Sequence, residues 1–282
     1  MDVSIIIVSY NTQQMLDDCI SSIMAHTKDV EYEIIIVDND SKDETCMMLE
    51  TKYPRVKLIK SRENLGFGRA NNLGMQKAKG KYLFLLNSDT ILLNNALKIF
   101  FDFAENSQLK IGALGAILKS PDGSNCHSFG KFLTLRGELR DVVAKYLKFL
   151  KDDSKFHPKS VDKPMPVDYI TGADMWVPQL VYKQLGGFDP SFFMYCEEVD
   201  WQRRMSDAGY VRLIINGPEI IHLEGGSDKN KTNIWSATRL KNIQNSKRIY
   251  FRKYNHGIKY TLFYFVYKVL WFPILFAIKR KL

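Results

Sequence analysis

Short apolar runs alternate with stretches of helical spacing through the first hundred residues. The apolar runs lie at 3–9, 33–37, 56–60 and 82–86. Between the first two, apolar residues recur every three or four positions, as on one face of a helix, at Met15, Leu16, Cys19, Ile20, Ile23 and Met24. Ser41 followed by Glu44 predicts a capping box at the start of the next helix. The alternation predicts an α/β fold with a mostly parallel sheet flanked by helices.

The pattern is less regular after residue 119. A turn signal at 121–123 leads into a polar and basic stretch, 128–166, that predicts a loop or an acceptor-side excursion. Order resumes with an apolar stretch at 168–176, helical patterns at 178–185 and 197–208 on either side of the turn 186–190, and short strand patterns at 211–215 and 220–223. One main domain is therefore expected.

Polar loops follow the predicted strands. They read Ser9-Tyr10-Asn11-Thr12, Asp38-Asn39-Asp40-Ser41, Asn64-Leu65-Gly66-Phe67-Gly68 and Asn87-Ser88-Asp89. In open parallel sheets, ligands bind outside the carboxyl ends of the strands, where such loops lie. The first strand is not followed by Gly-x-Gly-x-x-Gly, and the chain has no P-loop motif. A dinucleotide dehydrogenase and a P-loop enzyme are thereby disfavoured.

Five motifs in a fixed order resemble glycosyltransferase family 2, in its rhamnosyltransferase-like branch. They lie at 4–11, 37–41, 64–72, 85–90, and 187–189 through 197–201. The resemblance spans about 3–227 and implies a GT-A fold, divided into a nucleotide-binding half, about 1–120, and an acceptor half, about 121–227. It also implies transfer of a sugar from a nucleotide diphosphate donor, with dTDP-rhamnose as the branch-level expectation and UDP-sugars as alternatives.

A transferase of this kind must hold a pyrimidine base. Asp38, at the end of the second strand, can accept a hydrogen bond from the N3–H of uracil or thymine, and the resemblance implies the same role. A turn aspartate is the alternative from the residues alone. The predicted donor-binding residues are Ser9, Tyr10, Asn11, Asp38, Asn64, Gly66, Asn71, Asn87 and Ser88.

A divalent cation, Mg²⁺ or Mn²⁺, is the expected cofactor. Asp89 suits it, because hard cations in such sites use few protein carboxylates and take further oxygens from phosphates and water. The family pattern is Asp-x-Asp, and Asn87 stands at its first position, where ribose contact or a strand-ending cap are the two readings. The resemblance implies a second metal or diphosphate contact at His222, for which a structural role is the alternative.

The acidic run 197–201 carries the catalytic prediction. Carboxylates in the first turn of a helix are favoured by the helix dipole, so the run alone is ambiguous. With the resemblance, Glu198 is the predicted general base and Glu197 the alternative, because crowded carboxylates raise one another's pKa. Asp174, Asp200 and Trp201 are predicted acceptor or sugar ligands. A buried loop position is the alternative for Asp174, and a core position for Trp201.

The charge is concentrated at the C-terminus. Of the 40 Lys and Arg residues that give the net charge of +9, 13 lie at 229–282, a segment without Asp or Glu, and the rest of the chain is slightly acidic. Residues 261–278 are almost wholly apolar and flanked by Lys. The segment 228–282 therefore predicts a helical, interfacial membrane anchor, with a C-terminal helix pair over the core as the alternative. No nucleic-acid motif accompanies the charge.

These features together predict a cytoplasmic enzyme on the inner face of the cell membrane, with a glycan or polyprenol-linked acceptor. The N-terminus lacks the pattern of a signal peptide, and the four cysteines are too far apart to indicate a zinc site. Two other functions are weighed. A nucleotidyltransferase should show a Gly-rich basic loop after its first strand, and a binding-only relative should lack one of the carboxylates that are present here.

Overall fold

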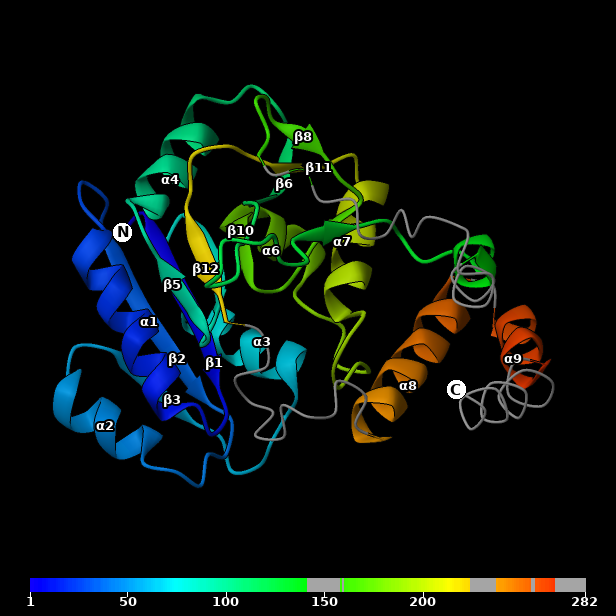
Figure 1. Cartoon of the computed structure of the whole chain (residues 1–282), viewed down its shortest axis with the longest axis horizontal. Coiled ribbons are helices and arrows are strands. Elements are labelled where there is room, and N and C mark those ends of the chain that lie inside the picture. Colours follow the sequence, from blue (N-terminus) through cyan, green and yellow to red (C-terminus); the bar gives the residue numbers. More distant parts are fainter. Residues whose placement is uncertain (141–157, 159, 224–236, 255–256, 267–282) are drawn as a thin grey trace.

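The computed structural model describes residues 1–140, 158, 160–223, 237–254 and 257–266 (Figure 1). Its centre is an eight-stranded sheet in the order β3-β2-β1-β4-β10-β6-β11-β8. Pairing is parallel except where β10 meets β4 and β6, and where β8 meets β11. The strands are β1 (Val3–Ser9), β2 (Tyr32–Asp38), β3 (Lys57–Lys60), β4 (Tyr82–Asn87), β6 (Ile111–Gly115), β8 (Met165–Pro166), β10 (Asp174–Pro178) and β11 (Val211–Ile214).

Two small sheets and a set of helices complete the described part. The small sheets pair β5 (Thr90–Leu92) with β12 (Ile220–His222), and β7 (Phe129–Gly130) with β9 (Tyr169–Ile170). The helices are α1 (Gln13–His26), α2 (Thr45–Lys52), α3 (Phe67–Lys77), α4 (Ala96–Asn106), α6 (Gln179–Leu185), α7 (Glu197–Asp207), α8 (Ala237–Lys253) and α9 (Gly257–Val266). The α/β class with a mostly parallel sheet is thus confirmed.

Alternation along β1 divides the core between the two faces of the sheet. Ile5 and Ile7 pack with residues of α1 and α4 on one face, and Ile6 packs with residues of α3, α6 and α7 on the other. On the first face, Trp176 stacks on Phe100, with ring centroids 5.5 Å apart. On the second, Gly74 permits the close approach of α3, because a Cβ there would lie 2.4 Å from Cγ2 of Ile6.

A third apolar cluster lies apart from the sheet, between the start of α7 and the helices α8 and α9. Its buried members are Phe192, Cys196, Val199, Tyr250, Phe251 and Tyr260. Phe251 and Tyr260 stack with ring centroids 4.4 Å apart, so α9 is folded back onto α8. Figure 1 shows these two helices (orange and red) at one end of the molecule, beside α7.

Two local predictions were wrong. Ser41 does not cap α2: its hydroxyl accepts from the Asn11 backbone N–H, and the Thr45 N–H at the start of the helix donates to Asp43 instead. The stretch 128–166 is not all loop either, since it contains β7, β8 and helical residues 135–140. The alternation of apolar residues is too short there to reveal two-residue strands.

The predicted membrane segment lies partly outside the described residues, because 267–282 are not among them. Within the part that is described, α9 covers ten residues, and no helix is both long and apolar enough to cross a bilayer.

Candidate active site

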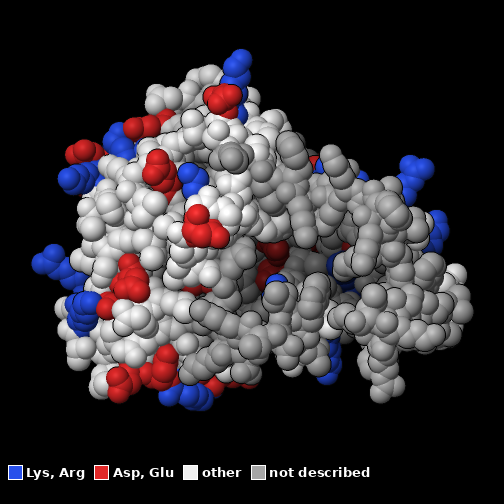
Figure 2. Space-filling model, viewed as in Figure 1, with Lys and Arg blue, Asp and Glu red and all other residues white. Residues whose placement is uncertain are grey.

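The carboxyl ends of three neighbouring strands meet at one edge of the sheet. Ser9 at the end of β1 lies opposite Asp38 at the end of β2, and Val8 lies opposite Asn87 at the end of β4. The polar loops that follow these strands are therefore brought together, as the sequence predicted. Figure 2 shows Asp and Glu side chains inside a hollow near the middle of one face of the molecule.

A chain of buried hydroxyls joins two of these loops. The Ser9 hydroxyl is 2.9 Å from that of Thr12, which donates to the Ser88 hydroxyl at 3.1 Å. All three residues are buried. Thr12 was not among the predicted residues, although it follows Asn11 directly in the first loop. The chain fixes the spacing between the β1 and β4 loops, which a bound nucleotide would have to bridge.

Asp38 lies in this edge as a buried carboxylate with one oxygen to spare. Its Oδ2 accepts from the Ser41 backbone N–H at 3.1 Å, and among the described residues its buried Oδ1 has no hydrogen-bond partner. A buried acceptor without a donor is destabilising by about 1–3 kcal/mol. Asp38 is thus suited to accept a hydrogen bond from a ligand N–H.

Asn11 of the first loop is hydrogen-bonded to Ser41 and Lys42 of the second loop. Asn11 adopts a left-handed conformation (φ 54°), and its side chain accepts from the Lys42 N–H at 2.7 Å. Tyr10, beside it, is exposed at the surface. These contacts leave the Tyr10 ring available for a ligand and place Asn11 in the wall of the site.

Three other predicted donor residues hold the loop that opens α3. Asn64 accepts from Asn39 at 3.0 Å and from the Gly66 N–H at 2.9 Å, and the buried Asn71 donates to the Phe67 carbonyl at 3.1 Å. Gly66 is left-handed (φ 79°), and a Cβ there would lie 1.9 Å from the Phe193 carbonyl oxygen. Their contacts are structural, and donor binding by these residues stays a prediction.

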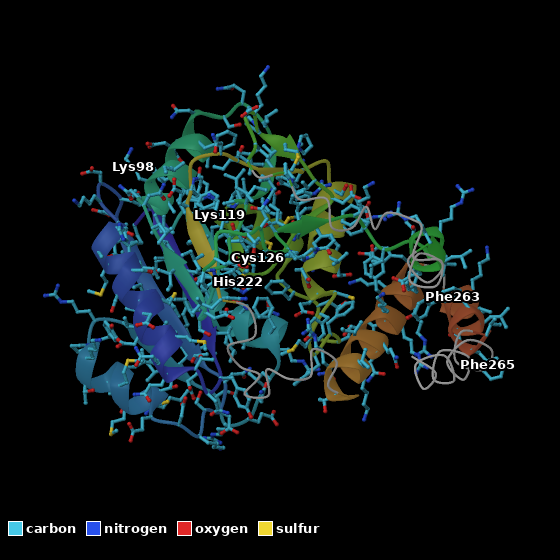
Figure 3. All side chains as sticks on the ribbon, viewed as in Figure 1. Lys98, Lys119, Cys126, His222, Phe263 and Phe265 are labelled. Carbon is cyan, nitrogen blue, oxygen red and sulfur yellow. The ribbon has the colours of Figure 1, made fainter. Side chains whose placement is uncertain are left out.

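The two predicted metal ligands lie side by side. β12 pairs with β5, and this places His222 Nε2 3.2 Å from Oδ1 of Asp89 and 3.4 Å from the Asn87 side chain. Figure 3 shows His222 on β12 beside Cys126, whose thiol donates to the His222 carbonyl at 3.5 Å. A carboxylate and an imidazole are ligands that Mn²⁺ accepts, whereas the Asn87 atom that faces His222 is the amide nitrogen Nδ2. Among the described residues, no group of three or more His, Cys, Asp or Glu forms such a site.

The acidic start of α7 follows a strained turn. Tyr195 (φ 73°) and Cys196 (φ 67°) are both left-handed, a conformation that is destabilising by about 1–3 kcal/mol for each non-glycine residue. Glu197, the next residue, is buried, and a Cβ on Gly68 of α3 would lie 3.4 Å from its Cγ. Burial and the neighbouring Glu198 charge raise the pKa of Glu197 well above its usual range. Burial against α3 therefore favours the protonated form of Glu197.

Glu198 has the properties of a base. It is only partly buried, so that an acceptor can reach it, and burial raises the pKa of its carboxyl to about 7. A carboxylate with a pKa near the working pH is both ionised enough to take a proton and basic enough to hold it. These contrasting environments favour Glu198 over Glu197 as the proton acceptor.

A short segment links the two halves of the site. Gln202, one turn after Glu198, donates to the carbonyls of Ile170 (2.7 Å) and Glu198 (3.2 Å). Three residues further along, the Ala173 carbonyl accepts from the Asn87 N–H at 3.0 Å. The segment 170–173 therefore connects a side-chain contact of α7 with the end of β4. Gln202 was missed, although its i+4 spacing from Glu198 places it on the same helix face.

The three predicted acceptor or sugar ligands, Asp174, Asp200 and Trp201, are buried in the protein. Both oxygens of Asp200 are taken, by Arg204 at 3.1 Å and by Lys253 at 2.8 Å and Tyr254 at 3.0 Å, and Trp201 packs in the core against Phe188. The prediction of ligand contact at these two residues does not fit their surroundings. Asp174 is fully buried; burial raises its pKa, one oxygen accepts from the Ala116 N–H at 2.6 Å, and the other is unpartnered. Asp174 lies in β10 and only one of its oxygens accepts from the backbone, so it is a buried residue but not a loop residue, and its role as an acceptor ligand stays a prediction.

Known proteins resemble this chain in sequence and in fold. Over 77% of its length it is 26% identical to the N-acetylglucosaminyl-diphospho-decaprenol L-rhamnosyltransferase of Mycobacterium tuberculosis, of which it covers 75%. It is 28% identical to rhamnosyltransferase WbbL of Escherichia coli K12, over 75% of this chain and 79% of that one.

Two solved structures share the fold. One is the Pyrobaculum calidifontis mannosyltransferase PcManGT in complex with GDP-Man and Mn²⁺ (TM-score 0.59, 14% identity, 89% of this chain and 64% of that one). The other is Staphylococcus aureus TarS 1-349 in complex with UDP (TM-score 0.54, 17% identity, 78% and 60%). The chain thus spans less than two thirds of either solved chain.

The fold is of the GT-A type, as in the solved mannosyltransferase. The family model for glycosyl transferase family 2 matches residues 4–163, and the chain belongs to that family. Its relatives place it in the rhamnosyltransferase-like branch, as the sequence motifs predicted.

The raised pKa of Glu198 predicts a pH-dependent stability. The unfolded glutamate ionises near pH 4.3. A carboxyl whose folded pKa is raised to about 7 contributes stability below the unfolded value that is lost as the pH rises through 7. Glu198→Gln cannot ionise, so we expect its Tm to exceed that of the parent at pH 8 and the difference to shrink towards pH 5, measured by calorimetry.

The exposed Glu63→Gln is the matched control and should show no such trend. A Glu198→Gln variant whose Tm follows the parent curve at every pH would refute the raised pKa.

Proposed function

We propose that this glycosyltransferase is an inverting, metal-dependent enzyme that transfers a sugar from a dTDP- or UDP-sugar to a hydroxyl of a lipid-linked glycan. The observation that carries the proposal is the pairing of Asp89 and His222 beside the end of β4, at the sheet edge where β1 and β2 also end. Rhamnose is the proposed sugar, because relatives that match 77% and 75% of the chain are named as rhamnosyltransferases.

Donor binding falls to the strand ends. The Oδ1 atom of Asp38 accepts a hydrogen bond from the N3–H of a pyrimidine base. The ribose then lies near Asn87, and the diphosphate lies near Asp89 and His222. Asp89 and His222 are the residues that hold the divalent cation, and the PcManGT structure contains Mn²⁺. When bound, such a cation offsets the charge of the departing diphosphate.

Glu198 carries the proton chemistry. Its ionised carboxylate takes the proton from the acceptor hydroxyl as that oxygen attacks the anomeric carbon, on the face opposite to the diphosphate. A single displacement of this kind inverts the configuration at that carbon. Glu197, buried and protonated, keeps a second negative charge away from the attacking oxygen.

Helix α9 has an exposed apolar face that suits contact with a membrane. On α9, the apolar side chains of Ile258, Leu262 and Phe265 are 89%, 64% and 63% exposed, and their i, i+4, i+7 spacing places them on one helix face. Residues 237–266 contain seven Lys or Arg and no Asp or Glu. Figure 3 shows Phe265 at the outer end of the molecule. We assign this face to docking on an anionic bilayer, where a polyprenol-linked acceptor would reside.

Nucleotide binding tests the donor site. We expect UDP or dTDP at 100 times its Kd to stabilise the parent by about 2.7 kcal/mol with Mn²⁺ and by much less without it, measured by thermal unfolding. Asp89→Asn should lose the Mn²⁺-dependent part, because it removes the charged ligand.

The exposed Asp162→Asn serves as the control and should keep the full shift. A parent that UDP and dTDP stabilise equally with and without Mn²⁺ would contradict the metal site, and one that neither nucleotide stabilises would contradict the donor site.

Vesicle binding tests the membrane face. We expect the parent to co-sediment with phosphatidylglycerol vesicles and the double variant Leu262→Glu, Phe265→Glu to do so several-fold less, because two charges replace apolar contacts with lipid. Leu180→Glu, at an equally exposed leucine (61%) on α6, is the matched control. If all three proteins sediment alike, α9 is not the docking element.

A further inference from the structure

The strained turn before α7 is supported from a distant part of the chain. Phe192, Cys196 and Val199, on either side of and within the turn, pack against Tyr250 and Phe251 of α8. Figure 1 shows α8 running beside α7. The turn thus has an apolar support made by residues about fifty positions later in the sequence.

Polar contacts from α8 hold the turn at both ends. Before the turn, the buried Ser246 hydroxyl donates to the Met194 carbonyl at 2.8 Å. On the preceding loop, Lys253 Nζ lies 2.6 Å from Oδ2 of Asp189, and in the first turn of α7 it lies 2.8 Å from Oδ1 of Asp200. One ammonium group therefore ties the entry of the turn to the helix that leaves it.

The ion pair with Lys253 lowers the pKa of the Asp189 carboxyl. Partial burial raises the pKa of Asp189, but the hydrogen bonds from Lys253 and Ser191 outweigh it and lower that pKa to about 2. Asp200 is completely buried, and its remaining contacts come from Arg204 of the same helix and from Tyr254, the residue after α8. Much of what fixes Asp200 against the rest of the molecule is thus supplied by 253–254.

A strained backbone persists only where its surroundings over-determine it. No glycine occupies the left-handed positions 195 and 196, so the local sequence does not favour the turn. The direction in which Glu197 and Glu198 project depends on this turn, because they are the first two residues of the helix that follows it.

We propose that Lys253 is a positioning residue of the transfer reaction: with Ser246, it holds the turn that aims Glu198 at the acceptor hydroxyl. The inference rests on the proposed function for the role of Glu198. It adds residues of α8 to those that position the candidate active site. The residue touches neither donor nor acceptor and acts through Asp189 and Asp200.

Kinetics and hydrogen exchange of single variants test the proposal. With dTDP-rhamnose and a short prenyl-diphospho-N-acetylglucosamine, we expect Lys253→Met to lower kcat by about 10- to 100-fold, since small displacements of a reacting group have effects of this size. The donor KM should stay within about twofold, because the strand-end loops are unchanged. Lys253→Arg should restore most of kcat, and Ser246→Ala should lower it in the same direction.

Amide hydrogen exchange gives a readout that needs no substrate. We expect residues 193–200 to exchange at least several-fold faster in Lys253→Met than in the parent, and the exposed Lys241→Met on the same helix to match the parent in both measurements. If the parent transfers no sugar from any donor, the proposed function fails, and the exchange at 193–200 still decides whether Lys253 holds the turn.

Two results would overturn the proposal. One is a Lys253→Met variant with parental kcat and parental exchange at 193–200. The other is a loss of kcat matched by an equal loss of donor binding and by faster exchange throughout the chain, which would make Lys253 a residue of general stability only.

Discussion

Two consecutive left-handed residues, Tyr195 and Cys196, decide where the acidic start of α7 points, and much of the candidate site depends on them. The turn directs Glu197 into the protein against α3 and leaves Glu198 partly accessible. Because burial disfavours two adjacent negative charges, the pKa of both carboxyls is raised, that of Glu197 well above its usual range and that of Glu198 to about 7. A chemical asymmetry between neighbouring glutamates thus arises from backbone geometry.

The fold of residues 1–120 could be predicted from the sequence because its signals are local. The runs at 3–9 and 82–86 are continuous and apolar, as strands buried on both faces require, and the polar residues after them fall at one sheet edge in any parallel sheet. Asp38, Asn87 and Asp89 were placed correctly for this reason. Asp89 and His222 come together through the β5–β12 pair; the family resemblance implied a shared role for them, but periodicity did not show the pairing.

The contacts of residues after 120 could not be predicted from the sequence, because they join residues far apart in the chain. Asp200 and Trp201 lie two and three residues after Glu198 in the sequence, yet helical geometry turns both inwards, where they contact Lys253 and Phe188. The bond from Ser246 to Met194 likewise joins residues 52 positions apart, and nothing local marks either one. The strands β7 and β8 have only two residues each, too few for a hydrophobic period to show.

The central claim is that Glu198 takes the proton from the acceptor, and its most direct test is the transfer rate of Glu198→Gln with donor and acceptor saturating. The account predicts that this variant keeps the parental affinity for the nucleotide and transfers sugar about 10² to 10⁴ times more slowly, the usual effect of losing a general base. A Glu198→Gln variant that transfers sugar at the parental rate would contradict the account.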